Sequence, residues 1–193
     1  MRAISAITNP PAIDVFTDFN LVGFDMENGE ISGYSNQQAT LLAVGIRETG
    51  QTNTLVSGNV NPAPGQKITL VPHQTSANTY AIIALDDTTD APSANMFKVR
   101  VVHVDRFTGP VDLYYVDPGA DLSQETPVVT DLTFQNNTDY FELPGGLQKE
   151  FVLTEAGTTN VVGNSIVFTS PVGGVRTLVL LDNGTPALNI YQD

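Results

Sequence analysis

The chain has 193 residues, of which 41% are hydrophobic and 15% charged, so it carries enough apolar material for a folded core. Twenty-one acidic residues against eight basic ones give a net charge of −13, which argues against nucleic acid or an anionic membrane surface as a partner. The absence of cysteine excludes disulfides and zinc-thiolate sites.

Short segments of alternating apolar residues, separated by turn residues, follow one another along the chain and predict β-strands. Asn-Gly, Pro-Gly and Gly-Gly pairs mark the turns between them. About seven short strands in each ~95 residues is the layout of an immunoglobulin-like sandwich. The expected strands cover residues 13–16, 40–47, 54–60, 68–71, 79–85, 99–102, 111–114, 140–143, 149–153, 165–169, 177–181 and 187–191.

An internal repeat is the most informative feature of the sequence. Three blocks recur in the same order, with offsets of 98, 107 and 96 residues. Offsets that drift by the length of a loop are typical of duplicated domains. The matched blocks are 2–6 and 12–16 with 100–104 and 110–114, 48–56 with 155–162, and 80–87 with 176–183.

The repeat predicts an all-β chain of two immunoglobulin-like antiparallel β-sandwich domains in tandem. The expected boundary lies in the polar stretch 88–95, which contains Pro92. We expect the first sandwich at residues 1–90, a short linker at 91–96 and the second sandwich at 97–193.

Three segments of the second repeat carry a family resemblance: Val-Arg-Val-Val-His-Val at 99–104, Pro-Val-Asp-Leu-Tyr at 110–114 and Tyr-Phe-Glu-Leu-Pro-Gly-Gly at 140–146. They resemble the bacterial and archaeal family known as domain of unknown function 4397. Its pattern has an arginine strand ending in VVHAS, then VDVY and a later Y…LPAG. Asp105 and Arg106 stand where the family usually has Ala and Ser. In the first repeat Ser5 replaces the histidine, so the second domain is the clearer match.

The resemblance implies an extracytoplasmic β-sandwich, often in tandem, on secreted or envelope proteins. It implies no established catalytic residues. We therefore expect an extracellular, cell-surface or periplasmic location, with a signal peptide already removed. The longest apolar runs are far below the roughly 20 residues that a membrane-spanning helix needs.

Catalytic residues are hard to find in the sequence. His73 and His103 are the two imidazoles that could serve as a base, and no nucleophile motif surrounds either, so we expect structural or solvent-exposed roles. Asp14 and Asp112 occupy the same place in both repeats, which favours a role in the fold over a unique catalytic one. A hydrolase with paired carboxylates is the least favoured hypothesis.

Acidic loops leave calcium as the one ion to consider. Clustered carboxylates suit this cation, although none of the loops has the EF-hand spacing. The candidate metal ligands are Asp86, Asp87 and Asp90, at the expected domain junction, where an ion would stiffen the linker. No other cofactor is expected.

The leading hypothesis is a non-catalytic structural or adhesive module of the cell envelope, which acts through contacts with proteins, including copies of itself. Sheet edges near Ile4 and Ile190 are the expected places for strand exchange between subunits. The alternative is a carbohydrate-binding module. It requires Tyr114, Tyr115 or Tyr140 to lie on an exposed face, whereas core packing is their ordinary use.

Overall fold

The computed structural model describes residues 1–18 and 20–193 and divides the chain into two compact units. Unit 1 is Met1–Thr88 and unit 2 is Thr89–Asp193. The expected end of the first repeat, at residue 90, lies just after this division. Each unit is described by itself below.

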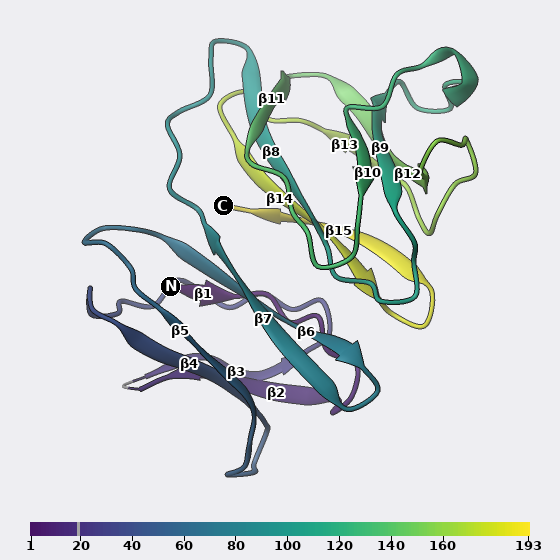
Figure 1. Cartoon of the computed structure of the whole chain (residues 1–193). Coiled ribbons are helices and arrows are strands. Elements are labelled where there is room, and N and C mark those ends of the chain that lie inside the picture. The colour runs from purple at the N-terminus through teal and green to yellow at the C-terminus, as the bar shows by residue number, and fades with distance from the viewer. Residues whose placement is uncertain (19) are drawn as a thin grey trace. The chain divides into compact units, whose positions relative to one another are not determined.

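Unit 1 consists of a four-stranded sheet and a three-stranded sheet (Figure 1). The larger sheet has the order β3-β2-β4-β5 and is antiparallel throughout. In the smaller sheet, β1-β6-β7, the first strand runs parallel to β6. The strands are β1 (Arg2–Ala3), β2 (Ala12–Thr17), β3 (Leu21–Glu27), β4 (Leu42–Glu48), β5 (Thr54–Val60), β6 (Ile68–Ser76) and β7 (Thr79–Asp86).

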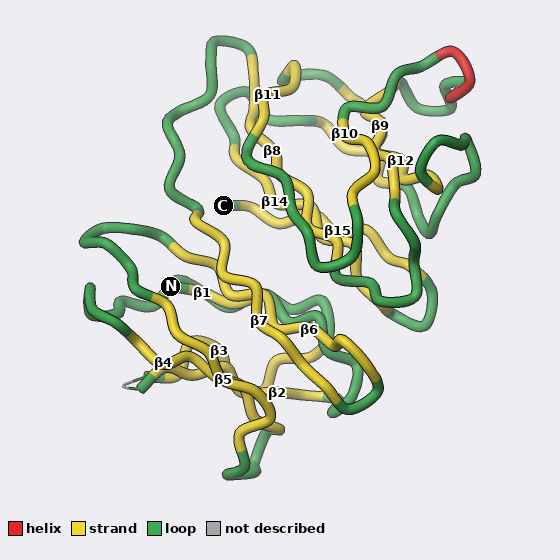
Figure 2. Tube along the Cα trace, viewed as in Figure 1, coloured by secondary structure: helices red, strands yellow, loops and turns green. Residues whose placement is uncertain are grey.

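Unit 2 has two four-stranded sheets, β10-β9-β12-β13 and β11-β8-β14-β15. Here too the first strand, β8, pairs in parallel with a later one, β14. A 3-10 turn, η1 (Leu122–Gln124), follows β9 and is drawn in red in Figure 2. The strands are β8 (Met96–His103), β9 (Val111–Val116), β10 (Val129–Leu132), β11 (Phe141–Pro144), β12 (Gln148–Glu155), β13 (Ile166–Thr169), β14 (Val175–Asp182) and β15 (Pro186–Gln192).

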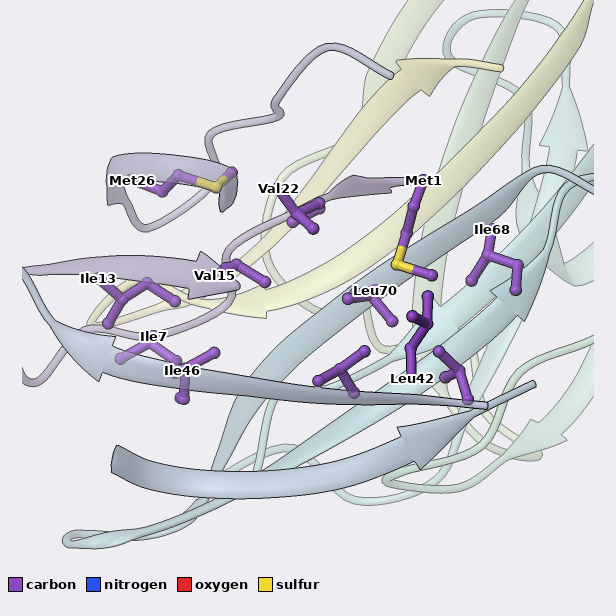
Figure 3. Packing of buried hydrophobic residues seen from close by; sticks show 13 residues of the cluster. Met1, Ile7, Ile13, Val15, Val22, Met26, Leu42, Ile46, Ile68 and Leu70 are labelled. Carbon is purple, nitrogen blue, oxygen red and sulfur yellow. The ribbon is translucent and has the colours of Figure 1, made fainter. Parts of the chain in front are cut away.

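Each unit closes around its own apolar core, to which both of its sheets contribute. In unit 1, Ile13, Val15 and Ile46 of the larger sheet pack with Leu70 and Ile68 of β6 (Figure 3). The corresponding core of unit 2 is richer in aromatic side chains and contains Phe97 and Phe151. Two half-buried sheets stacked face to face form a β-sandwich.

The predicted all-β class and β-sandwich fold are confirmed. Three strands, β1, β3 and β10, were not predicted. The last two are outer strands of their sheets, and each contains an aspartate in the left-handed region, Asp25 with φ 52° and Asp131 with φ 54°. The pairing with β2 or β9 shifts register near these residues, which breaks the alternation that predicts a strand.

Equivalent pairings relate the strands of the two units. Arg2 is opposite Thr69 in unit 1, as Arg100 is opposite Thr177 in unit 2. Therefore β6 corresponds to β14, and the next strand, β7, corresponds to β15. The third repeat block, which matched residues 80–87 to 176–183, is thus wrong. The correct match joins Thr-Leu-Val at 69–71 to Thr-Leu-Val at 177–179, at an offset of 108 residues.

The part of the chain that the structure describes holds no helix with the length and apolar character of a membrane span.

Leu178 tests the core of unit 2, because it is fully buried at the centre of β14. We expect Leu178→Ala to lower the free energy of unfolding by about 2–5 kcal/mol, since it leaves a cavity in a packed core. Urea denaturation followed by circular dichroism measures this change. Leu147→Ala is the matched control, because Leu147 is 45% exposed and its truncation should change stability by less than about 0.5 kcal/mol. Equal effects of the two substitutions would contradict the assigned core.

Candidate functional site

Both histidines are buried and bonded to the backbone. The Nδ1 atom of His73 lies 3.1 Å from the Val71 carbonyl oxygen, and the Nε2 atom of His103 lies 3.0 Å from the Gly109 carbonyl oxygen. Burial lowers the pKa of each imidazole below its ordinary value of 6.5. Neutral, buried rings of this kind stabilise local backbone and are poorly placed to reach a substrate.

The two repeated aspartates hold the irregular outer strands in place. Asp14 accepts hydrogen bonds from the Asp25 N–H at 3.1 Å and from the Arg47 guanidinium at 3.1 Å. Asp112 accepts them from the Asp131 N–H at 2.8 Å and the Gly157 N–H at 2.8 Å. Each carboxylate thus accepts a hydrogen bond from the N–H of an aspartate with positive φ, Asp25 in unit 1 and Asp131 in unit 2. The predicted role in the fold agrees with this geometry, but both side chains are buried and not solvated.

A second duplicated group was missed at the sequence level, a buried arginine beneath a tyrosine ring. In unit 1 the Arg2 guanidinium carbon lies 4.7 Å from the centre of the Tyr34 ring, and Arg2 Nε donates to Thr69 Oγ1 at 2.7 Å. The Tyr34 hydroxyl donates to Asp87 Oδ2 at 2.6 Å. Burial, followed by this bond to the carboxylate, raises the pKa of the Tyr34 phenol well above 10.

Unit 2 repeats this group residue by residue. Arg100 lies 4.6 Å from the centre of the Tyr140 ring and donates from Nε to Thr177 Oγ1 at 2.9 Å. The Tyr140 hydroxyl donates to Asp193 Oδ2 at 2.9 Å. The signal in the sequence was the repeated Thr-Leu-Val segment, which aligns Thr69 with Thr177. The group anchors the first strand of each unit and has no catalytic geometry.

The three candidate calcium ligands fall on both sides of the division between the units. Asp86 and Asp87 belong to unit 1 and Asp90 to unit 2. The Asp87 carboxylate already accepts the Tyr34 and Thr69 hydroxyls and forms an ion pair with Arg2, and Asp86 accepts the Gln66 amide. Among residues 1–18 and 20–193, no group of three or more His, Asp or Glu side chains is placed to hold a metal ion. Calcium binding stays a prediction.

The three tyrosines of the carbohydrate hypothesis do not form an exposed platform. Tyr114 is buried. Tyr115 packs its ring 5.0 Å from that of Phe151 and donates to the Pro144 carbonyl, and Tyr140 is held by Arg100 as described. Tyr114 and Tyr115 take part in the core packing that the sequence also allowed, whereas Tyr140 covers Arg100.

A groove of about 770 Å³ opens on the surface of unit 2. Its apolar part includes Phe107, which is 72% exposed, and Val161, which is 56% exposed. The carboxylates of Asp131 and Glu155 line the same groove. Solvent-exposed large apolar side chains beside a hollow are typical of a protein-interaction surface. Sequence patterns missed this site because both residues lie in loops.

Unit 1 carries a groove of about 470 Å³ between two chain segments, residues 34–39 on one side and residues 62–68 on the other. The Met1 and Ile68 side chains, which belong to the core, form part of its lining. Figure 3 shows both of them beside Leu42 at one end of the core cluster. The groove therefore reaches from the surface to the end of the apolar core.

Comparison with protein families matches residues 1–114 to a family described as Domain of unknown function (DUF4397). The chain belongs to this family. The match covers all of unit 1 and continues through β8 into β9, as far as Tyr114, so it includes two of the segments that carried the resemblance, 99–104 and 110–114. It does not reach 140–146, and the expectation that unit 2 is the clearer match is corrected accordingly.

No curated protein matches the chain. Among solved structures, similarity is found to a carbohydrate-binding module of family 26 from Eubacterium rectale, solved with maltoheptaose, at a TM-score of 0.31 and 10% identity. A streptococcal virulence factor described as binding alpha-glucan has a TM-score of 0.33 and 16% identity. Each comparison covers 100% of this chain and 96% of the other. Similarity at this level carries no inference about a ligand.

Asp112 gives a test of the repeated aspartates. Asp112→Ala leaves the N–H groups of Asp131 and Gly157 without their acceptor, so we expect the free energy of unfolding to fall by about 1–3 kcal/mol. Urea denaturation measures it, with Asp139→Ala as the control, because Asp139 is exposed. Stability losses of equal size in both variants would show that the Asp112 bonds contribute nothing specific.

The buried histidines predict a pH dependence of stability. Since the folded pKa of each is below 6.5, the unfolded chain takes up protons first as pH falls, and stability is lost from about pH 6.5 downward until the folded pKa is reached. Hydrogen bonds from Ser93 and Ser165 lower the pKa of Glu142 and Glu150, respectively, below 4.5. The folding stability that these two carboxylates contribute is therefore lost only in more acid solution than the histidine effect.

The measurement is the unfolding midpoint in urea between pH 7.5 and 5. The double variant His73→Gln, His103→Gln should lose less stability over this range than the unmodified protein, because glutamine does not titrate. Superimposable pH profiles for the two proteins would refute the assignment to the histidines.

Proposed function

We propose that the chain is a non-catalytic, extracytoplasmic structural or adhesive module that works through protein–protein contacts, as a surface or fibre subunit that associates with copies of itself. The observation that carries this proposal is the groove of unit 2, whose lining includes the exposed apolar side chains of Phe107 and Val161. Family membership and the acidic surface are compatible with it.

Phe107 has the character of an anchor residue at an interface. Its ring is largely exposed, and the Arg106 guanidinium carbon lies 4.5 Å from the ring centre, which supports the ring from one side. An exposed aromatic beside a hollow can bury a large area at small entropic cost.

The polar residues give no competing support to catalysis. Both imidazoles are neutral and bonded to carbonyl oxygens, and the carboxylates of Asp14, Asp112 and Asp87 are engaged in hydrogen bonds that hold the fold. An enzyme needs a titratable group that can reach its substrate. A binding role requires none of these groups to be free.

One expected site of strand exchange is wrong. Ile4 is fully buried, and its strand is bonded on both sides, to Leu70 by the Ile4 N–H and to Glu30 by the Ser5 N–H. The other expected edge, at Ile190 on the outer strand β15, is partly capped. The Asn164 side chain pairs with both the N–H and the carbonyl of Leu188 and so closes part of this edge.

The alternative function, carbohydrate binding, has less support, because Tyr114, Tyr115 and Tyr140 do not form the exposed platform that it needs. Screening the protein against a glycan array, with maltoheptaose included, tests it directly. Saturable binding to a defined glycan would favour the alternative over the main proposal.

Self-association through the unit 2 groove is tested with the double variant Phe107→Ser, Val161→Ser. Sedimentation velocity and light scattering over a range of concentrations should show oligomers of the unmodified protein. The double variant should associate more weakly, with a dissociation constant about tenfold higher or more. Phe24→Ser is the control, because Phe24 is 68% exposed in unit 1. A protein that stays monomeric throughout, or oligomers insensitive to the double variant, would overturn the proposal.

A further inference from the structure

The loop between β8 and β9, residues 104–110, carries the exposed ring of Phe107. Residues 107–110 of this loop contribute to the lining of the unit 2 groove. The loop contains neither helix nor strand, so the position of the ring depends on the side chains that fix the loop backbone. Two buried side chains do this: His103 at the end of β8, which is 0% exposed, and Asp105 within the loop, which is 1% exposed.

His103 ties the far end of the loop to the sandwich. Its Nε2 atom lies 3.0 Å from the Gly109 carbonyl oxygen, and this nitrogen carries the proton because a carbonyl oxygen can only accept. The backbone of His103 is fixed as well. Its N–H donates to the Asn136 carbonyl at 2.9 Å, and its carbonyl accepts the Gln135 N–H at 2.8 Å. The imidazole therefore extends from a well-anchored strand end to Gly109.

Asp105 fixes the turn that contains Phe107. Its Oδ1 atom accepts the Phe107 N–H at 2.9 Å, and its Oδ2 atom accepts the Thr108 hydroxyl. Together with the His103 bond, these contacts hold the loop on both sides of the exposed ring. A loop that is ordered before binding loses less conformational entropy when it makes an interface.

The second ring nitrogen of His103 is the weak point of this arrangement. In the part of the chain that the structure describes, Nδ1 is buried and has no hydrogen-bond partner. The neutral ring leaves only a lone pair unsatisfied there. A proton on Nδ1 would add a buried charge and a donor without an acceptor, and both are costly.

Few charged groups lie on the segments that contact His103. The loop contributes Asp105 and Arg106, and β14, which pairs with His103, contributes Asp182. Arg106 and Asp182 form an ion pair with each other at 4.0 Å. Residues 134–137, which bond to the His103 backbone, contain no charged residue. Asp105 is thus the main carboxylate near the ring, and it is already engaged in the turn.

Unit 1 lacks this arrangement. Ser5 stands where unit 2 has His103. The loop that follows is held from β6 instead, because Gln74 Oε1 accepts the N–H groups of Thr8 at 3.1 Å and Asn9 at 3.3 Å. Glutamine does not titrate, and no described residue of the loop between β1 and β2 is an exposed large apolar side chain. An exposed ring and a titratable support occur together in the unit 2 loop.

We propose that His103 and Asp105 are positioning residues that hold the Phe107 loop in place, and that a second proton on His103 releases this loop. For the contact through the unit 2 groove the consequence rests on the proposed function: the contact weakens in acid, because its aromatic anchor is no longer fixed. The behaviour of the loop itself does not depend on a partner.

The direction of the pH effect follows from burial. Burial lowers the pKa of the His103 imidazole in the held loop below its ordinary value of 6.5, which the ring regains when the loop is released. The held loop is therefore fully stable above about pH 6.5. Below this pH the equilibrium between held and released loop shifts by about tenfold for each pH unit, until the pKa of the held state is reached.

The first readout is the hydrogen-exchange protection factor of the Phe107 amide, measured by NMR on the full chain at pH 7.5 and pH 5.5. In the unmodified protein it should fall by about tenfold over this range. His103→Gln can still donate to the Gly109 carbonyl and does not titrate, so it should keep the protection at both pH values. His103→Leu has no donor and should lose about fivefold at both. His73→Gln, the matched control in unit 1, should behave like the unmodified protein.

The second readout is self-association by sedimentation velocity at the same two pH values. The unmodified protein and His103→Gln should have equal dissociation constants at pH 7.5, and at pH 5.5 that of the unmodified protein should be about tenfold higher. Acid also reduces the repulsion between chains of net charge −13, but this effect is common to both proteins.

The two readouts distinguish this inference from the proposed function. The inference is overturned if Phe107 protection is the same in the unmodified protein, His103→Gln and His103→Leu, or if His103→Gln shows the same fall in acid. Monomers at both pH values, with Phe107 protection changing as expected, would uphold the role of His103 in the loop and overturn self-association.

Discussion

The parallel pairing of the first strand of each unit, fixed by one buried arginine, is the constraint on which the rest of the structure depends. A buried guanidinium is costly unless it is paired. Arg2 meets Thr69 and Asp87, and the tyrosine ring of Tyr34 covers it. Because threonine and aspartate come from β6 and from the end of β7, this pairing sets the register of the whole smaller sheet. Unit 2 solves the same problem with the same residue types.

The two units share this frame and differ in the grooves on their surfaces. In unit 2, the exposed side chains of Phe107 and Val161 line a groove together with Asp131 and Glu155. In unit 1, a groove between residues 34–39 and residues 62–68 reaches the end of the apolar core.

The acidic residues divide into those that hold the fold and those that shape the surface. Asp14 and Asp112 satisfy backbone N–H groups in irregular outer strands, and Asp87 completes the arginine group. Removing water from these carboxylates is tolerated because each accepts several hydrogen bonds. Others, such as Asp131 and Glu155, remain exposed and give the unit 2 groove its negative charge. A surface of this kind repels the phosphate backbone of nucleic acids.

The sequence by itself determined the strand-rich class, the repeated Asp14 and Asp112, and the family, because alternation and short motifs are local properties of the chain. It did not predict β3 and β10, since their left-handed aspartates interrupt that alternation. It also matched β7 to the wrong strand of unit 2, because alternating apolar strands resemble one another, and only pairing distinguishes β14 from β15. The arginine group was decided by tertiary structure alone. It brings together residues more than 30 positions apart, whose contacts exist only once β1 lies beside β6.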